Sequence, residues 1–402
     1  MSFISERVSR IKPSSTIAMN QKAIELKEAG HDIISLSAGE PDFDTPESIK
    51  EAAMAAIRSG QTKYTAVDGT TELKQAIIKK FKKENDLVYQ LDQITVGSGG
   101  KQVIYNAMFA TLNENDEVII PTPYWVSYPD IVMLAGGTPI FIPCSRENNF
   151  KLSPADLDQA ITPRTKWIIF NSPSNPTGTT YSKDEIKALA DILLEPKNQH
   201  VWILTDDIYE HLTYDNFAFY TMAQVEPKLF NRCLTVNGVS KAYCMTGWRI
   251  GYAGGPIHLI KTMAKIQSQS TSNPSSISQA AAVAALNGPQ HFIAEHNKIF
   301  CERRNLLVDA LSDIKGLSCN KALGAFYLYV NCEKMMNKTD SKGQVIKSDD
   351  DFVIFLLDQA KIAVVAGSGF GLSPYFRISY ALSTERLKDA IIRLRTACLS
   401  LV

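Results

Sequence analysis

A lysine and an arginine, eight residues apart, are the first candidates for chemistry in this sequence. Lys241 follows a short apolar run at 234–236, which is typical of a buried strand and ends before Gly238, and Arg249 lies in a second strand-like run. A lysine among small residues can form a Schiff base with an aldehyde, and an arginine suits a phosphate. A single lysine after a strand is more typical of an exposed surface. The rest of the chain must therefore decide between the two interpretations.

A glycine-rich turn follows another predicted strand, at 94–96. Gly99 and Gly100 precede Lys101 and a predicted helix over 102–112. Backbone N–H groups at the start of such a helix are open and its dipole favours an anion, so the turn can bind a phosphate. Glycine turns are common, and this one alone is weak evidence.

Polar and aromatic side chains follow three more predicted strands. Trp125, Asn175 and Asp206 each come after an apolar run, and Tyr209 follows Asp206 by three residues. A carboxylate directly after a buried strand needs a positive partner or hydrogen bonds, whereas an aromatic residue there is more often part of the core. Ligands bind beyond the carboxyl ends of parallel strands, so we expect these residues and Lys241 in one crevice.

Taken together, these features match the requirements of pyridoxal phosphate. Its phosphate suits a helix N-terminus, its ring a stacking partner, its pyridine nitrogen a carboxylate, its phenolic oxygen hydrogen-bond donors and its aldehyde a lysine. The combined pattern is much more specific than any one of its parts. The sequence therefore predicts pyridoxal 5′-phosphate as the cofactor.

The elements that must position these residues are apolar runs alternating with helical stretches. The runs lie at 94–96, 118–120, 139–142, 167–170, 201–204 and 234–236. They lack a period-2 alternation, which predicts an α/β fold with a mainly parallel sheet covered by helices on both faces. A long helix over 286–311 is expected to lead into a smaller unit from about 300 to 402, with strands at 325–330 and 375–380.

The composition is that of an ordinary globular protein of 402 residues, with 45% hydrophobic and 21% charged residues. Lys plus Arg equals Asp plus Glu at 42 each, so the net charge is zero. The chain lacks the excess of basic residues that is typical of proteins that bind nucleic acid or an anionic membrane. We also expect no signal peptide and no membrane helix. The seven cysteines are scattered and the six histidines have no metal-ligand spacing. These features predict a cytoplasmic protein with reduced thiols and no metal site.

With these residues in place, the whole chain resembles a fold-type I pyridoxal-phosphate enzyme, specifically the bacterial class I (branch Ib) aspartate aminotransferases. The resemblance rests on Ser37-Ala38-Gly39-Glu40-Pro41-Asp42, on 171–178, on Asp206-Asp207-Ile208-Tyr209-Glu210, and on Ser240-Lys241 through Arg249. It implies a large domain with a mainly parallel seven-stranded sheet flanked by helices, and a smaller α+β domain. The implied divisions are 1–45 for the N-terminal arm and part of the small domain, 46–300 for the large cofactor-binding domain and 301–402 for the small C-terminal domain.

The resemblance also implies a role for each residue around the cofactor. Lys241 is the lysine that joins the cofactor and then moves the substrate's proton. The other implied contacts are Asp206 with the pyridine nitrogen, Tyr209 and Asn175 with the phenolic oxygen, Gly99, Gly100, Lys101 and Arg249 around the phosphate, and Trp125 on the ring. Tyr64 resembles the tyrosine that reaches the phosphate of the neighbouring subunit, which implies a homodimer with shared sites.

For the substrate, the resemblance implies a clamp for two carboxylates. Arg377 matches the arginine that binds the α-carboxylate in this family. An arginine suits this role because its planar guanidinium can donate two hydrogen bonds to one carboxylate. Considered alone, Arg377 would be more typical of a surface arginine at a strand end. Gly39, Trp125 and Asn175 complete that clamp. Thr16 and Lys101 match the pair that binds a second carboxylate.

Three features depart from the family pattern or could mislead. Asp207 stands where the family has glutamate, and Gly238 stands where some relatives have a phosphate-binding serine. The glycine-rich run at 364–371 follows a strand, but position 372 is leucine and no room remains for a complete dinucleotide-binding unit. We expect that run to be a loop near the substrate entrance.

The predicted activity is reversible transfer of the amino group of L-aspartate to 2-oxoglutarate, giving oxaloacetate and L-glutamate by a ping-pong mechanism. The first alternative is a bifunctional aspartate/prephenate aminotransferase that also forms arogenate, with Lys12 beside the entrance as a candidate contact. A cofactor-binding regulator and a β-eliminating lyase remain as further alternatives. The regulator would require a DNA-reading module that the sequence does not contain.

Overall fold

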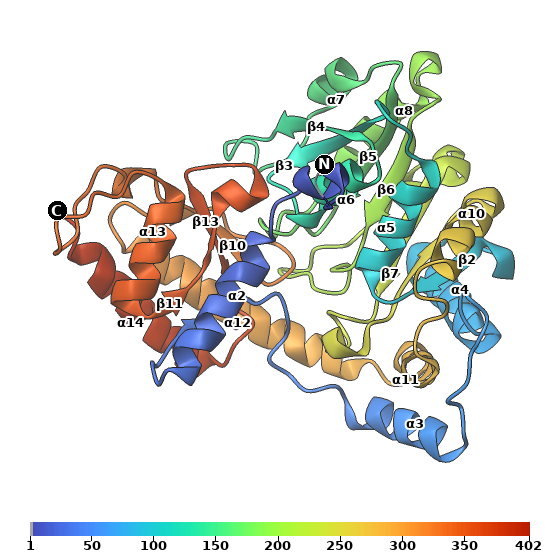
Figure 1. Ribbon diagram of the computed structural model, residues 1–402, viewed down its shortest axis with the longest axis horizontal. Coiled ribbons are helices and arrows are strands. Elements are labelled where there is room, and N and C mark those ends of the chain that lie inside the picture. Colours follow the sequence, from blue (N-terminus) through green and yellow to red (C-terminus); the bar gives the residue numbers. More distant parts are fainter. Residues whose placement is uncertain (1–2) are drawn as a thin grey trace.

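A seven-stranded sheet forms the larger part of the molecule, in a computed structural model that describes residues 3–402 (Figure 1). Its strands are β2 (Ile94–Gly97), β3 (Glu117–Thr122), β4 (Thr138–Pro143), β5 (Thr165–Asn171), β6 (Trp202–Asp206), β7 (Cys233–Gly238) and β8 (Gly251–Gly254). They lie in the order β2-β8-β7-β6-β5-β3-β4. The strands from β7 to β4 pair in parallel, and β8 runs antiparallel to both of its neighbours. The predicted mainly parallel sheet is confirmed.

Helices cover both faces of this sheet, which explains why its strands read as continuous apolar runs. In β5, Trp167 and Ile169 belong to the core on one face, and Ile168 and Phe170 belong to the core on the other. On the first face lie α5 (Gly100–Thr111), α6 (Ser127–Leu134) and α10 (Ile257–Ser268). On the second lie α3 (Glu47–Arg58), α4 (Thr71–Asn85), α7 (Pro154–Ala160), α8 (Lys183–Leu194), α9 (Met222–Val225) and α11 (Ser276–Asn287).

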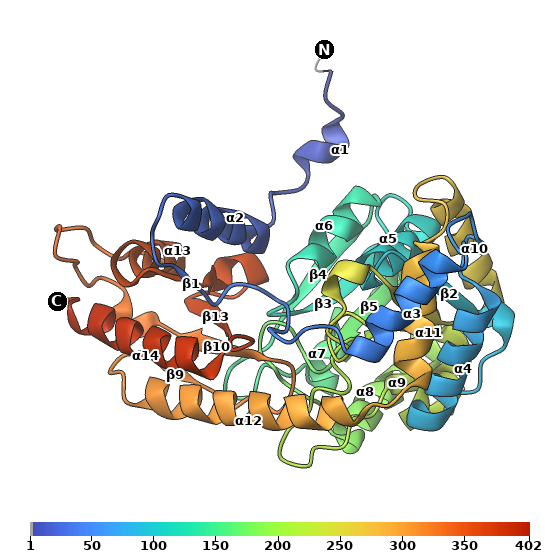
Figure 2. The same ribbon diagram turned by 90° about the horizontal axis from the view of Figure 1, so that it is seen from below.

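A smaller antiparallel sheet has its own core and lies beside the first unit (Figures 1 and 2). Its order is β12-β13-β10-β9, with β9 (Ser318–Cys319), β10 (Tyr327–Asn331), β12 (Val365–Ala366) and β13 (Tyr375–Ser379). The accompanying helices are α2 (Ser15–Glu28), α12 (His291–Ser312), α13 (Asp349–Phe355) and α14 (Thr384–Leu399), whereas α1 (Glu6–Ser9) contacts α6 of the larger unit. A separate parallel pair joins β1 (Ile34–Ser35) to β11 (Ile362–Ala363).

Two predicted elements differ from the structure. The helix predicted over 286–311 is α12, which begins later, at His291, because Gly288 and Pro289 separate it from the end of α11. Arg249 does not lie in a strand: it has a left-handed backbone, with φ of 57°, at the end of a short 3₁₀ turn (Thr246–Trp248). The domain boundaries at 45 and 300 stay predictions, and the second falls inside α12.

Two general features of the chain bear on its class. No helix in the part of the chain that the structure describes is both long and apolar enough to cross a membrane. All seven cysteines are free thiols.

Candidate active site

A cavity of about 210 Å³ lies at the carboxyl ends of β5 and β6, beside the N-terminus of α5 and against residues of the smaller unit. Most of the residues that were predicted from the sequence to form the site line this cavity. Those lining it are Thr16, Gly39, Gly100, Lys101, Trp125, Asn175, Asp206, Tyr209, Lys241, Arg249 and Arg377. Strand ends in a parallel sheet meet at one edge, and the residues following them have been brought together as expected.

Lys241 projects into this cavity from the turn after β7. Its Nζ donates a hydrogen bond of 2.6 Å to the carbonyl oxygen of Gly39 and lies 5.9 Å from the centre of the Tyr209 ring. Burial, reinforced by the positive charges of Arg249 and Arg377, lowers the pKa of its amine to about 8. This amine is therefore neutral much more often near physiological pH than an ordinary lysine amine, and a nucleophile or a base must be neutral.

Asp206 lies at the end of β6, where it is 7% exposed. Tyr128 donates a hydrogen bond of 2.6 Å from its hydroxyl to Oδ2, and the backbone N–H of Ile208 lies 3.4 Å from Oδ1. Burial raises the pKa of this carboxyl, while the Tyr128 hydrogen bond and the charge of Lys241 act in the opposite direction. A cationic ligand group facing Asp206 would stabilise its charged form.

Two residues of this arrangement were not found from the sequence. Tyr128, on α6, is one of them, and its hydroxyl donates the hydrogen bond to Oδ2 of Asp206. Asn171, at the end of β5, donates to the backbone oxygen of Asp206 at 2.7 Å and accepts from the backbone N–H of Asn175 at 2.9 Å. The position of Asn171 directly after an apolar run was a usable signal, because the same reasoning had selected Asp206. Tyr128 lies within a helix and carried no such signal.

The glycine turn before α5 forms a seat for an anion. Gly99 caps the helix with φ of +87°, a conformation that favours glycine, and a β-carbon there would lie 3.1 Å from Nη1 of Arg249. The Arg249 guanidinium is held over the turn by a hydrogen bond of 2.9 Å from Nη1 to the backbone oxygen of Thr246. The open N–H groups of a twelve-residue helix and a guanidinium thus face the same place.

Arg377 lies on β13 and is only 1% exposed. Its Nη1 donates to Oδ1 of Asn175 at 2.8 Å and its Nη2 donates to the backbone oxygen of Ser37 at 2.6 Å. The guanidinium stacks over Tyr327, 4.5 Å from the ring centre, and Nε has no hydrogen-bond partner within residues 3–402. A buried cation with only neutral partners is suited to an anionic ligand.

Lys101 and Thr16 lie at another part of the cavity wall. The ammonium of Lys101 lies 5.0 Å from the centre of the Trp125 ring, and burial together with the charge of Arg249 lowers its pKa. The Thr16 hydroxyl has no hydrogen-bond partner among the described residues. Within residues 3–402 Lys101 forms no ion pair, so this cation and the Thr16 hydroxyl on the same wall are suited to a second negative group.

Two predicted site residues lie apart from the others. Gly99 does not line the cavity itself, since it lies behind Gly100 in the turn. Tyr64 is 91% exposed and borders a separate hollow of about 500 Å³ with Thr65 and Ser276. Its predicted role in a neighbouring subunit therefore stays a prediction.

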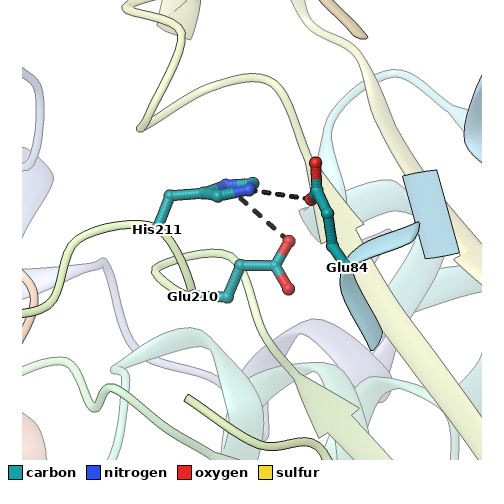
Figure 3. A group of neighbouring side chains, drawn as sticks. All are labelled: Glu84, Glu210 and His211. Atoms are coloured by element: carbon teal, nitrogen blue, oxygen red, sulfur yellow. Dashed lines mark hydrogen bonds and ion pairs between the residues drawn. The ribbon is translucent and has the colours of Figure 1, made fainter. Parts of the chain in front are cut away.

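A polar network behind the turn of residues 207–212 has the donor atoms of a metal site (Figure 3). His211 lies 2.9 Å from Glu84 through Nε2 and 3.7 Å from Glu210 through Nδ1. The ammonium of Lys80, however, pairs with the Glu210 carboxylate and lies 3.6 Å from Glu84, and Asn237 donates to Glu210 at 2.7 Å. A metal ion here would lie beside that ammonium. We interpret the group as an ion-pair network that ties the turn after β6 to β7.

Asp207, the departure from the family pattern, provides a test of buried charge. It is 2% exposed, and burial raises its pKa well above the ordinary value, opposed by a hydrogen bond with Thr221. An unfolded aspartate ionises near pH 4 but this buried one only at higher pH, so native stability falls as pH rises above about 4. We expect Asp207→Asn to remove this loss and raise the melting temperature by about 1–3 °C at neutral to alkaline pH.

Thermal melts of the wild type, Asp207→Asn and an exposed control, Asp92→Asn, would measure this at about pH 5 and about pH 8. The advantage of Asp207→Asn over the wild type should be larger at the higher pH, and Asp92→Asn should follow the wild type. An equal advantage at both pH values would contradict the assignment.

A buried amine, a carboxylate and three cationic side chains, Arg249, Arg377 and Lys101, around one cavity define an enzyme that acts on small anionic molecules. The chain matches the family model of aminotransferase class I and II over residues 31–394. It belongs to this family and is an aminotransferase.

Relatives match over almost the whole chain. A probable aspartate/prephenate aminotransferase of Rhizobium leguminosarum bv. phaseoli is 58% identical over 398 residues, 99% of each protein. An aspartate/prephenate aminotransferase of Cereibacter sphaeroides is 56% identical over 401 residues, 100% of each. The crystal structure of the aspartate aminotransferase from Rhizobium meliloti superposes with a TM-score of 0.96 at 54% identity, covering 100% of both chains. The predicted fold-type I architecture is confirmed.

Proposed function

We propose that this chain transfers the amino group of L-aspartate to 2-oxoglutarate, with pyridoxal 5′-phosphate bound in the cavity around Lys241. The observation that carries the proposal is that Lys241 shares one cavity with the Asp206 carboxylate and the Arg377 guanidinium. The names of the relatives support the substrate class, since they are aspartate or aspartate/prephenate aminotransferases.

The residues around the cavity fit this cofactor. The N-terminus of α5 and Arg249 suit its phosphate, and the face of Trp125 suits its ring. The buried Asp206 carboxylate would hold a proton on the ring nitrogen, because a cation there would relieve the cost of its burial. Tyr209, whose hydroxyl lies 2.8 Å from that of Tyr327, and Asn175 would hold the phenolic oxygen.

The chain's own residues then divide the remaining work. Arg377, with Gly39 and Asn175, would bind the α-carboxylate of the amino acid, and Lys101 with Thr16 the second carboxylate. Once bound, the cofactor supplies an electron sink for the carbanion at the substrate's α-carbon. Lys241, whose amine lies in the same cavity, would accept the proton from the substrate's α-carbon and hold it for the return transfer. Its amine is suited to both transfers because its pKa is lowered to about 8.

A panel of amino donors tests the substrate assignment. L-Aspartate with 2-oxoglutarate should react much faster than neutral or aromatic amino acids with the same acceptor. Only a dicarboxylate can pair with both Arg377 and Lys101. A preference for a neutral donor over aspartate would overturn the proposal. Pyruvate release from cysteine conjugates, measured on the same preparation, would indicate β-elimination.

Prephenate is the second candidate acceptor, favoured by the names of two close relatives. Prephenate is also a dicarboxylate, so its two carboxylates would pair with the same two cations, Arg377 and Lys101. Steady-state rates with oxaloacetate and prephenate, measured side by side with a common amino donor, would decide. Arogenate formation at a kcat/KM within about tenfold of the oxaloacetate reaction would indicate a bifunctional enzyme. A value lower by several orders of magnitude would leave aspartate transamination alone.

We further propose that the protein works as a cytoplasmic homodimer. Phe3 and Val8 are exposed, the N-terminal arm that carries α1 projects beyond the rest of the molecule (Figure 2), and Tyr64 is also exposed. A second copy would bury such apolar surface and place Tyr64 at a neighbouring phosphate. Free cysteines support a reducing compartment. The domain division at 1–45, 46–300 and 301–402 is part of the same proposal.

A further inference from the structure

The irregular segment 37–45, between β1 and α3, provides backbone contacts to two cationic groups of the cavity. The backbone oxygen of Ser37 accepts from Arg377 at 2.6 Å, and that of Gly39 accepts from Lys241 at 2.6 Å. Gly39 also approaches the small sheet closely, because a β-carbon there would lie 2.8 Å from the hydroxyl of Tyr327. The positions of these two carbonyl groups therefore help to set the positions of both cations.

The long helix α12 holds this segment along one face. His296, Phe300 and Arg303 lie at spacings of four and three residues, so their side chains project from the same side of the helix. Phe43 stacks on the ring of His296 at 3.8 Å between centres and lies edge-on to Phe300 at 5.4 Å. The segment thus sits on α12, which extends beneath the small sheet toward the helices of the large one (Figure 2).

Arg303 makes the strongest of these contacts. It is 5% exposed, and its Nη1 and Nη2 donate to the two carboxylate oxygens of Asp42 at 2.7 and 2.9 Å. Its guanidinium also lies 5.3 Å from the centre of the Phe43 ring. A bidentate pair fixes both the position and the orientation of the carboxylate. Asp42 lies three residues from Gly39, with Pro41 limiting the backbone between them.

We propose that Arg303 is a positioning residue for binding of the substrate's α-carboxylate. It does not touch the cavity. By fixing Asp42 it holds the carbonyl group of Ser37, and through it Arg377, in the arrangement that receives the carboxylate. The inference rests on the proposed function, since it concerns the same site and a dicarboxylate ligand.

The helix also provides a matched control. Arg304, the next residue, is fully buried and binds Asp215 at 3.0 Å and the backbone oxygen of Ala322 at 2.8 Å. Its partners do not line the cavity. Lysine at either position keeps the charge but loses the planar guanidinium. Arg303→Lys removes the bidentate pair with Asp42, and Arg304→Lys removes the separate bonds to Asp215 and Ala322, which have no connection to the site.

The experiment measures binding of maleate, a dicarboxylate without an amino or keto group, to the cofactor-loaded enzyme by calorimetry. Arg303→Lys is expected to weaken binding about fivefold or more and to raise KM for aspartate similarly, with kcat within about twofold of the wild type. Asp42→Asn, which keeps the shape but weakens the pair, should act in the same direction. Arg304→Lys should lower the melting temperature while leaving maleate affinity within about twofold.

Two results would overturn the inference. One is unchanged maleate affinity in Arg303→Lys, or in Asp42→Asn if the first variant does not fold. The other is an equal loss of affinity in Arg304→Lys, which would indicate a general effect of destabilising α12. Failure of the wild type itself to bind maleate would instead overturn the proposed dicarboxylate function, and the inference with it.

Discussion

Replacing Lys241 with alanine should abolish transamination, lowering kcat on the order of 10⁵-fold or more. The variant loses the amine that joins the cofactor and the base that moves the substrate's proton, and the neighbouring residues Ser240 and Ala242 offer neither group. The absorbance of the lysine-bound cofactor near the visible edge should disappear with the activity. Stopped-flow absorbance and steady-state turnover measure both effects.

The matched control is Lys261→Ala, an exposed lysine on α10, which should keep wild-type turnover. A second measurement uses the lowered pKa of Lys241, about 8, which makes its amine increasingly neutral as pH rises through that value. The rate at which cofactor-free protein takes up pyridoxal phosphate should therefore rise with a midpoint near that pKa. Wild-type turnover in Lys241→Ala, or an uptake midpoint close to that of an ordinary lysine, would contradict the assignment.

Removing the carboxylate of Asp206 should give the second largest effect. Asp206→Ala is expected to lower kcat roughly 10²- to 10³-fold, about 3–4 kcal/mol of transition-state stabilisation, because an unprotonated pyridine is a poor electron sink. Cofactor affinity should fall as well, since the ring nitrogen loses its charged partner. Steady-state kinetics and equilibrium titration with pyridoxal phosphate measure the two losses separately.

Two neighbouring variants separate this role from general packing. Tyr128→Phe removes only the hydroxyl that donates to Asp206 at 2.6 Å, so we expect a smaller loss, about tenfold, together with weaker cofactor binding. Asp207→Asn changes the adjacent buried carboxyl, which does not line the cavity, and should leave kcat close to wild type. A near-normal rate in Asp206→Ala, or an equal loss in Asp207→Asn, would argue against the assigned role.

The large sheet and the cofactor-facing residues were predictable because both depend on local pattern. Unbroken apolar runs indicated strands buried on both faces, and β5 places alternate residues in two separate cores. Asp206 was found because a carboxylate directly after a buried strand is costly unless it has a partner, and Asn175 because it offers an amide in the turn after the apolar run at 167–170. Because the parallel strands end at the same edge of the sheet, both residues lie in one cavity with Lys241.

What the sequence could not provide were contacts between distant segments. Tyr128 reaches Asp206 across 78 positions, and Arg303 reaches Asp42 across 261, and neither pair has a local signature. The backbone of Arg249 was misjudged because apolar neighbours on both sides resembled a strand, whereas the chain turns through a left-handed residue there. Only the assembled fold shows these arrangements.

The pairing of β6 with β7 has a consequence for how this protein can vary. Asp206 lies opposite Val236, five residues before Lys241, in a ladder of parallel hydrogen bonds. A slip of one residue would turn the apolar side chains of β7 to the wrong faces, so the separation between carboxylate and amine is set by the sheet and not by the connecting chain. That connection includes an exposed turn at Asp215 and Asn216. Its length can therefore change, by insertion after Asn216 that keeps the pair between Asp215 and Arg304, without changing the distance across which the two groups act on a ligand.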